Sequence, residues 1–175
     1  MRERMWELKQ RAEDPGHLEL YIYGDVEGDS YDWRRDEIIR SETSANAFRE
    51  TLASYPDVQQ IDLYINSYGG SVFEGTAIYN QLKRHPARKT VYVDGFACSI
   101  ASVIAMAGDT VVMPRNALMM VHNMSMGVWG NAAELRKAAD DLDVMQPGGP
   151  GGLSGKAGDK LSEEMIARWR MTRRG

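Results

Sequence analysis

The chain has 175 residues, of which 43% are hydrophobic and 26% charged, the length and composition of one soluble globular domain. The formal net charge of −4 gives no electrostatic reason to expect nucleic acid or an anionic membrane as a partner. We therefore expect a single domain over residues 1–175, with neither a membrane nor nucleic acid among its partners.

The cytoplasm is the expected location, because the sequence has the features of a protein from a reducing compartment. The one cysteine, Cys98, has no second cysteine with which to form an internal disulfide. Residues 1–16 are charged and lack the apolar run of a secretory signal. The longest apolar stretch, residues 100–107, is too short to cross a bilayer.

The first half of the chain alternates between strand-like and helix-like segments. Residues 18–23 (LELYIY) read as a strand, and Ser44 is a plausible N-cap for a helix that Pro56 ends. Apolar residues alternate over 61–65 (IDLYI), which predicts a second strand. This alternation favours an α/β architecture.

The middle of the chain repeats the same order. A turn over 66–71 (NSYGGS) leads into a helix over 72–84, and a strand over 90–93 is followed by a small-residue helix over 99–107. Two short apolar strands follow, at 110–113 and 118–121, and the second of them leads to His122.

The C-terminal part begins with an amphipathic helix over 130–145, whose inward-facing residues are expected to be Leu135, Ala138, Ala139 and Leu142. The pattern breaks at 146–155 (QPGGPGGLSG), because no helix can carry so many Pro and Gly residues. A short helix is expected over 162–170.

Two strand-to-helix junctions could carry chemistry. Gly69 and Gly70 permit the positive φ or close approach that aims a backbone N–H into a cleft, although a plain glycine turn fits equally well. Ser99 would open a helix, where unpaired N–H groups face a developing anion. The alternative is an N-cap serine of a buried helix, and the G-x-S-x-G motif is not present there. Cys98 is a rival nucleophile, although a cysteine beside an apolar run is usually an inert core thiol.

A serine nucleophile needs a histidine base, and the sequence holds three histidines. His17 lies in a polar segment, and His85 lies at a helix end between Arg84 and Pro86. His122 ends an apolar strand, where catalytic groups are often held above a sheet, although a structural histidine fits that position too.

Three of these segments together resemble the Clp protease family. INSYGGSVFEGTAIYNQLK is similar to that family's glycine turn and helix, GFACSIAS to its nucleophile turn, and MMVHNMS to its histidine strand. Their order and spacing agree over residues 18–145. The segments LYIYGDV, SETSANAF and KLSEEMIA resemble the phage and prophage branch of the family, which contains head-maturation proteases.

The resemblance implies a set of site residues. Ser99 is the nucleophile, His122 is the general base, and the backbone N–H groups of Gly69 and Ile100 form the oxyanion hole. The segment 69–72 is expected to pair with an extended substrate as an added strand. The substrate-strand residues are Gly70, Ser71 and Val72.

The resemblance also implies a fold, an activity and partners. The fold is the Clp-protease/crotonase-like fold of stacked ββα units, and the activity is that of a serine endopeptidase on protein or peptide substrates. No cofactor and no metal are expected. The family assembles as homo-oligomeric rings, heptamers or tetradecamers, and works with an unfoldase ATPase, whereas the phage branch matures capsids.

The chain departs from the family in several places. Tyr68 replaces the usual proline, residues 1–17 are an N-terminal extension, and 130–175 read as an atypical, truncated handle and C-terminal region. The triad acid is absent from its expected place, and its loss costs about 10⁴ in kcat. The possible substitutes are Asp94, Asp109, Asp141 and Asp159. An altered reading frame would explain 146–155 and the C-terminal segment.

Two alternatives stay open at this point. One is a crotonase-type acyl-CoA enzyme, which shares the fold and a glycine-amide oxyanion hole but needs no serine nucleophile. The other is a catalytically impaired, ring-forming Clp-like protein, which the missing acid suggests.

Overall fold

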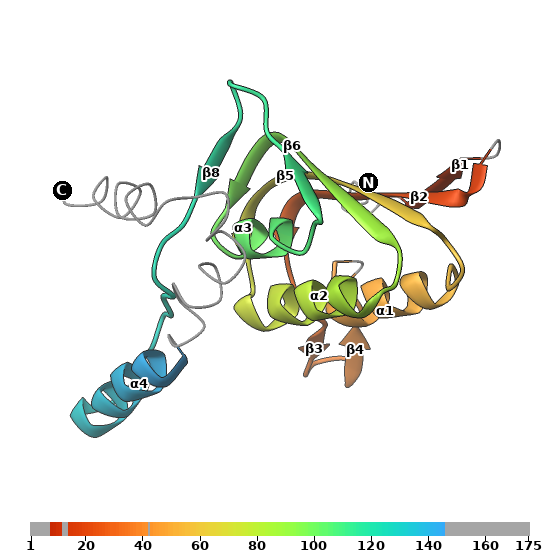
Figure 1. Ribbon diagram of the computed structural model, residues 1–175. Helices are drawn as coiled ribbons and strands as arrows, with labels where there is room; N and C mark the ends of the chain where they lie inside the picture. The colour runs from red at the N-terminus through yellow and green to blue at the C-terminus, as the bar shows by residue number, and fades with distance from the viewer. Residues whose placement is uncertain (1–7, 12–13, 42, 146–175) are drawn as a thin grey trace. The chain divides into compact units, whose positions relative to one another are not determined.

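The computed structural model describes residues 8–11, 14–41 and 43–145, and strands alternate with helices along them (Figure 1). The strands are β1 (Leu8–Arg11), β2 (Asp14–Val26), β3 (Ser30–Asp32), β4 (Glu37–Ile39), β5 (Gln60–Gly70), β6 (Arg88–Cys98), β7 (Thr110–Val112) and β8 (Leu118–Met120). The helices are α1 (Ala45–Ala53), α2 (Val72–Arg84), α3 (Ile100–Ala105) and α4 (Ala132–Met145). The predicted α/β alternation is confirmed.

The strands that carry the candidate site lie next to each other in one six-stranded sheet. Its order is β1-β2-β5-β6-β7, and β8 also pairs with β6. β1 is antiparallel to β2, whereas β2, β5 and β6 run parallel, as do β7 and β8 beside β6. Because parallel strands end at the same edge, the turns that follow β5 and β6 lie next to each other.

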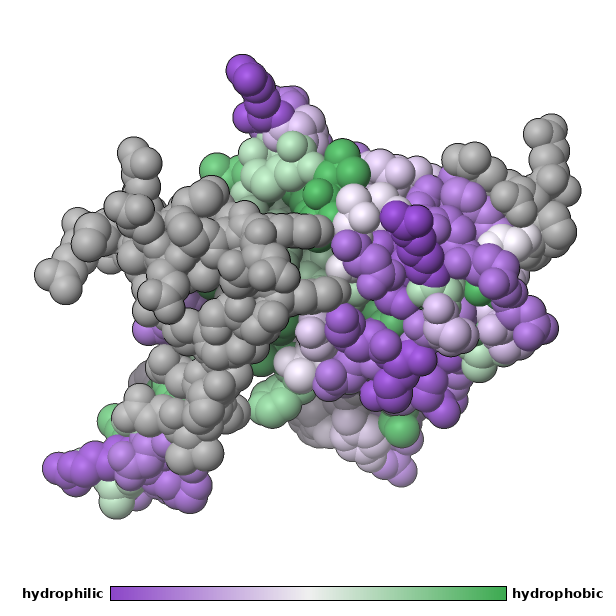
Figure 2. Space-filling view, in the orientation of Figure 1, coloured by the Kyte–Doolittle hydropathy of each residue, from purple (hydrophilic) through white to green (hydrophobic). Residues whose placement is uncertain are grey.

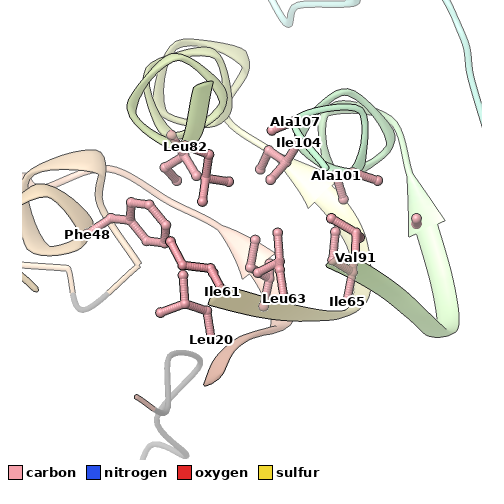
Figure 3. Close-up of a cluster of buried hydrophobic side chains, with 14 of the residues drawn as sticks. Leu20, Phe48, Ile61, Leu63, Ile65, Leu82, Val91, Ala101, Ile104 and Ala107 are labelled. Atoms are coloured by element: carbon pink, nitrogen blue, oxygen red, sulfur yellow. The ribbon is translucent and has the colours of Figure 1, made fainter. Parts of the chain in front are cut away.

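The core lies between one face of this sheet and the helices α1, α2 and α3. Alternate residues of neighbouring strands share this face, so that Leu20 pairs with Leu63 and Leu63 with Val91, each at most 1% exposed. Phe48 of α1 and Leu82 of α2 pack against them (Figure 3). Burying each such side chain stabilises the fold by about 1.5–3 kcal/mol. The outer sides of α1 and α2 are largely hydrophilic (Figure 2).

The opposite face of the sheet carries a row of stacked tyrosines. Tyr21, Tyr64 and Tyr92 are paired in register on β2, β5 and β6, with ring centroids 4.8 Å and 5.0 Å apart. Burial and a hydrogen bond to Glu19 raise the pKa of Tyr21 to about 12. Burial and a hydrogen bond to Asp94 raise the pKa of Tyr23 to about 12 as well.

The β3–β4 hairpin was not expected from the sequence. It pairs Ser30 with Ile39 and Asp32 with Glu37, and it branches from the connection between β2 and α1. Its tip exposes Trp33, which is 74% accessible. Strands of three residues with charged neighbours have no clear period-2 pattern, which is why the sequence did not predict them.

The chain forms two compact units, residues 1–120 and residues 121–175. The described part of the second unit contains α4, which confirms the predicted helix. Its apolar stripe is less buried than expected, since Leu135 is 45% exposed and Ala139 is also exposed, whereas Ala138 and Leu142 are half-buried. An amphipathic pattern predicts that a face will be covered, but not which surface covers it.

Several predictions concern residues outside the described ones. These are the break at 146–155, the helix over 162–170 and most of the atypical C-terminal region. Among the helices that the structure does describe, none has both the length and the apolar composition for a membrane span.

Candidate active site

Ser99 occupies a sharp turn between a strand and a helix. β6 ends at Cys98 and α3 begins at Ile100, so the turn consists of Ser99 alone. Its backbone has φ 53° and ψ −126°, in the region of positive φ that favours glycine. Holding a non-glycine residue there costs about 1–3 kcal/mol, and such strain is concentrated at functional sites.

Backbone contacts on both sides hold the strained turn in place. The Ser99 N–H donates to the carbonyl of Met120 on β8 at 2.8 Å. The Ser99 carbonyl accepts from the Ser102 N–H at 3.0 Å and from the Ser102 hydroxyl at 2.6 Å. Ser102 is fully buried, so the surrounding structure fixes the conformation of the turn.

Small residues make this turn possible. Ala97 and Ala101 lie two positions before and after Ser99, and both are fully buried. They occupy the places of the two glycines in a G-x-S-x-G nucleophile elbow, which is a strained strand-to-helix turn of the same kind. The literal motif gave no support from the sequence, but the pattern A-C-S-I-A carries the same steric signal.

The Ser99 hydroxyl is not used as a helix cap. Ser99 stands at the N-cap position of α3, but its side chain makes no capping hydrogen bond. By contrast, Ser44 and Ser71 cap α1 and α2 with their side chains. The structure therefore rejects the alternative that Ser99 is an ordinary N-cap serine.

The glycine turn consists of Gly69 and Gly70, the last two residues of β5, which extends into the predicted turn over 66–71, and it packs directly against Ser99. Gly69 has φ 106°, and a Cβ atom added there would lie 2.8 Å from Ser99 Cβ and 3.3 Å from the Ile100 N atom. Three of the predicted site residues, Ser99, Gly69 and Ile100, are thus neighbours. Ile100 is the first residue of α3, and the N–H groups of a first helical turn have no intrahelical partner.

The Gly69 amide already has a partner in this structure. Its N–H donates to the hydroxyl of Ser67 at 3.0 Å, a contact that is buried. An oxyanion at Gly69 must therefore compete with the Ser67 hydroxyl for the same proton. The sequence held no signal for this contact, because Ser67 lies in an ordinary turn sequence.

The predicted substrate-strand residues lie at the end of β5 and the beginning of α2. Gly70 pairs with Val26 of β2 and has φ 142°. The Ser71 N–H donates to the Val26 carbonyl at 2.7 Å, and Val72 is the first residue of α2. Since the Ser71 N–H faces β2, it is not available to a substrate strand in this structure.

His122 belongs to the second unit, and its imidazole has a defined partner there. The Nδ1 atom lies 2.6 Å from the backbone carbonyl oxygen of Asn123. A carbonyl only accepts hydrogen bonds, so this contact requires a proton on Nδ1. The neutral ring then carries its lone pair on Nε2, which is the tautomer that a general base needs. Ser99 lies in the first unit, and its pairing with His122 stays a prediction.

The described candidates for the triad acid each have a partner. Asp94 accepts from the Tyr23 hydroxyl at 2.6 Å, and Asp141 pairs with Lys137 at 2.7 Å. Asp109 accepts from the Lys89 N–H at 2.8 Å. The fourth candidate, Asp159, lies outside the described residues. No carboxylate contact to His122 is among the described ones.

Cys98, the rival nucleophile, lies in the core. Its side chain is 2% exposed, and burial raises the pKa of its thiol, while the Met120 backbone acts in the opposite direction. The thiol therefore stays protonated at neutral pH. Elsewhere in the described ranges, no three His, Cys, Asp or Glu side chains gather into a metal-binding group.

Comparison with known proteins relates this chain to the Clp proteases. The family model described as Clp protease matches residues 38–158. The ATP-dependent Clp protease proteolytic subunit 3 of Streptomyces coelicolor is 38% identical over 86 residues, which cover 47% of this chain and 39% of that protein. The proteolytic subunit 1 of Corynebacterium jeikeium is 35% identical over 110 residues, which cover 61% of this chain and 57% of that protein. The chain thus spans about half the length of these curated relatives.

A solved structure shares the fold. The chain of a mutant ClpP1 from Listeria monocytogenes matches with a TM-score of 0.62 at 18% identity, covering 89% of this chain and 80% of that chain. The predicted Clp-protease fold is therefore confirmed.

Proposed function

Because this chain belongs to the Clp protease family, we propose that it is a serine endopeptidase that cleaves peptide bonds through an acyl-enzyme. Ser99 attacks the carbonyl of the scissile bond, and His122 takes the hydroxyl proton and returns it to the leaving amine. Water then attacks the ester, with the same base, and releases the second product and the free serine. The Gly69 and Ile100 amides stabilise both oxyanions.

The observation that carries this proposal is the strained turn at Ser99. A serine at φ 53°, not used as a cap, contacts a glycine turn and a helix N-terminus that can each supply an N–H donor. A purely structural serine gains nothing from this strain, whereas a nucleophile gains a hydroxyl held at a defined position.

The position of His122 in the chain supports its role as the base. It comes two residues after Met120, whose carbonyl accepts the Ser99 N–H. Covalent geometry keeps the Cα atoms of Met120 and His122 within about 7 Å of each other. The Nδ1 proton donated to Asn123 leaves Nε2 as the nitrogen that can accept a serine proton.

The Asn123 carbonyl takes over part of the role of the missing acid. An Asp-to-Asn change in a serine triad costs about 10⁴ in kcat largely because the histidine adopts the wrong tautomer. A backbone carbonyl at Nδ1 selects the correct tautomer but adds no negative charge to stabilise the imidazolium. We therefore expect a slow but genuine peptidase.

Assembly, partners and substrates are part of the same proposal. Two of the relatives are named proteolytic subunits of ATP-dependent Clp proteases, so we propose a homo-oligomeric ring, a heptamer or a tetradecamer, that receives polypeptides from an unfoldase ATPase in the cytoplasm. The exposed apolar stripe of α4, including Leu135, is consistent with contacts between subunits. In its most specific form, the proposal is that the peptidase cleaves capsid or scaffold protein, as members of the phage branch do.

Serine-directed labelling tests the nucleophile. A fluorophosphonate probe should modify wild-type protein at Ser99, as mapped by mass spectrometry, and the modification should disappear in Ser99→Ala. The control is Ser54→Ala, which removes an exposed hydroxyl from the end of α1. Equal peptide turnover by wild type and Ser99→Ala would support the impaired, ring-forming protein, and hydration of an enoyl-CoA without labelling would support the crotonase type.

A second experiment tests the role of the Asn123 carbonyl. The ¹⁵N chemical shifts of the His122 ring should show a proton on Nδ1 in the neutral form. The substitutions Asp94→Asn, Asp109→Asn, Asp141→Asn and Asp159→Asn should each change kcat by less than about threefold, against about 10⁴ for a true triad acid. A loss of the larger size in any one variant identifies that residue as the acid and overturns this part of the proposal.

A further inference from the structure

Glu74 connects the first turn of α2 with the N-terminus of α1. Its Oε2 atom accepts a hydrogen bond from the Ala45 N–H at 2.6 Å. The backbone N–H of Glu74 in turn is capped by the Ser71 hydroxyl, at 3.4 Å. A Cβ atom added at Gly28 would lie 2.9 Å from Glu74 Oε1, so the carboxylate fills the space between Gly28 and α1.

This contact completes a series of hydrogen bonds that links the end of β2 to the N-termini of α1 and α2. At one end, the Val26 carbonyl holds the Ser71 N–H at 2.7 Å. The next residue, Glu27, exchanges two hydrogen bonds of 3.0 Å with the Thr43 hydroxyl, and Thr43 is 8% exposed. The chain from β2 to α1, residues 27–44, therefore carries the exposed β3–β4 hairpin. Its far end is held to α2 by the hydrogen bond between Ala45 and Glu74.

The neighbouring residue, Gly75, faces the nucleophile turn. A Cβ atom added there would lie 2.2 Å from Ile100 Cγ1, so α2 packs on α3 without an intervening side chain. A movement of the first turn of α2 would therefore reach Ile100 through this contact, and would reach Gly69 along the chain, because α2 begins three residues after Gly69. Both predicted oxyanion donors depend on where this turn lies.

We propose that Glu74 is a positioning residue for the oxyanion donors, because it fixes the first turn of α2 against the N-terminus of α1. This inference rests on the proposed function. Glu74 does not touch substrate. It sets the placement of Ile100 through Gly75, which packs against it, and the placement of Gly69 along the chain, because α2 begins three residues after Gly69.

Three variants and one control test the proposal in the full chain. Glu74→Ala removes the acceptor for the Ala45 N–H, whereas Glu74→Gln keeps an oxygen that can accept it. Gly28→Ala leaves Glu74 in place but displaces its carboxylate, which is the flexible end of a side chain. The control is Glu50→Ala, which removes the same charge from an exposed site on α1 that makes only surface ion pairs.

We expect a loss in kcat rather than in substrate binding. Glu74→Ala should lower kcat for a peptide substrate roughly tenfold, with KM changed by less than about twofold, since an oxyanion donor acts in the transition state. Gly28→Ala should give a smaller loss in the same direction, and Glu74→Gln should restore most of the activity. Amide hydrogen exchange over residues 69–75 should accelerate in Glu74→Ala and not in Glu50→Ala.

The readouts separate this inference from the proposed function. If wild-type protein is not labelled at Ser99, the peptidase assignment fails, while the exchange measurement still tests whether Glu74 holds the turn. If wild type is active, equal kcat in Glu74→Ala and Glu50→Ala overturns the proposal, as does a lower Tm with unchanged kcat and exchange. Should Glu74→Ala not fold, Gly28→Ala, which keeps every polar group, carries the same test.

Discussion

Two strand-to-helix turns lie side by side at one edge of the sheet, and they reach positive φ in opposite ways. The turn at the end of β5 uses Gly69 and Gly70, which adopt φ 106° and 142° without a Cβ penalty. The turn after β6 uses Ser99 at φ 53°, where a side chain is costly. The first turn presents backbone N–H groups, whereas the second must present a hydroxyl. A strained serine beside two relaxed glycines is the arrangement that the proposed nucleophile requires.

The largest effects are expected at Ser99, where two substitutions should lose the same activity but differ in stability. Ser99→Ala and Ser99→Gly should both lower peptide hydrolysis by at least about 10², since removing the serine of a complete triad costs about 10⁶ and about 10⁴ of this is already lost without the acid. Only Ser99→Gly relieves the positive φ, so it should be more stable than Ser99→Ala by about 1 kcal/mol. Denaturant unfolding of the two variants measures this difference. Equal stabilities would mean that the turn is not strained.

At Gly69 a substitution is expected to lower both the stability and the peptidase activity of the protein. A Cβ atom there meets Cys98 O and Ser99 Cβ at 2.8 Å, and φ 106° is unfavourable for alanine. Gly69→Ala should destabilise the protein by about 3 kcal/mol and abolish peptide hydrolysis. Chemical denaturation and a peptide assay of the folded fraction provide the measurement. Full activity in Gly69→Ala would show that this turn is not part of the site.

An intermediate effect is expected where the helices behind the two turns meet. Gly75→Ala places a Cβ 2.2 Å from Ile100 Cγ1 and should cost about 1–3 kcal/mol through overpacking. Shortening the opposing side chain in Gly75→Ala/Ile100→Ala should recover part of that loss. A double-mutant cycle on the free energy of unfolding measures the coupling. Strictly additive effects would show that the two residues do not share this contact.

The smallest effect concerns the tyrosine face, which lies on the other side of the sheet from the core. Tyr21 and Tyr23 have a pKa of about 12 in the folded protein against the ordinary value of 10.0, so folding favours their neutral forms. Their contribution to stability is complete below pH 10 and is lost as the pH rises toward 12. Phenolate absorbance should follow this shift, and Tyr21→Phe and Tyr23→Phe should flatten the decline. Titration of all tyrosines near pH 10 in folded protein would contradict it.

Much of the fold could be predicted because its signals are local. The alternation over 61–65 and the helical pattern over 72–84 correspond to β5 and α2, and Ser44 caps α1 as expected. The β3–β4 hairpin was missed because its strands are three residues long and exposed. Strand β1 was missed because it is defined by its pairing with β2, a contact that a single segment does not reveal.

The proximity of Gly69 to Ser99 and Ile100 could be predicted from the sequence, whereas the roles of these residues stay predictions. Parallel strands bring the Gly69 and Ser99 turns to the same edge, so the proximity of these two residues follows from the predicted topology. The literal G-x-S-x-G motif gave no support for Ser99, because alanines stand where that motif has glycines. The bonds of Ser67 to Gly69 and of Glu74 to Ala45 depend on side-chain geometry, which no sequence pattern specifies.

If the proposed function holds, strand β8 is a point at which the activity could be controlled. It has three residues, it pairs with β6, and its last carbonyl is the acceptor that holds the Ser99 N–H. So short an edge strand can detach at far lower cost than global unfolding. Once β8 detaches, the Ser99 N–H loses its acceptor and the residue can leave its positive φ. The hydroxyl would then no longer be held in one position, while the hydrophobic core would stay packed. A contact that stabilises β8 would then raise the activity of the proposed peptidase, and detachment of β8 would leave a folded but inactive protein.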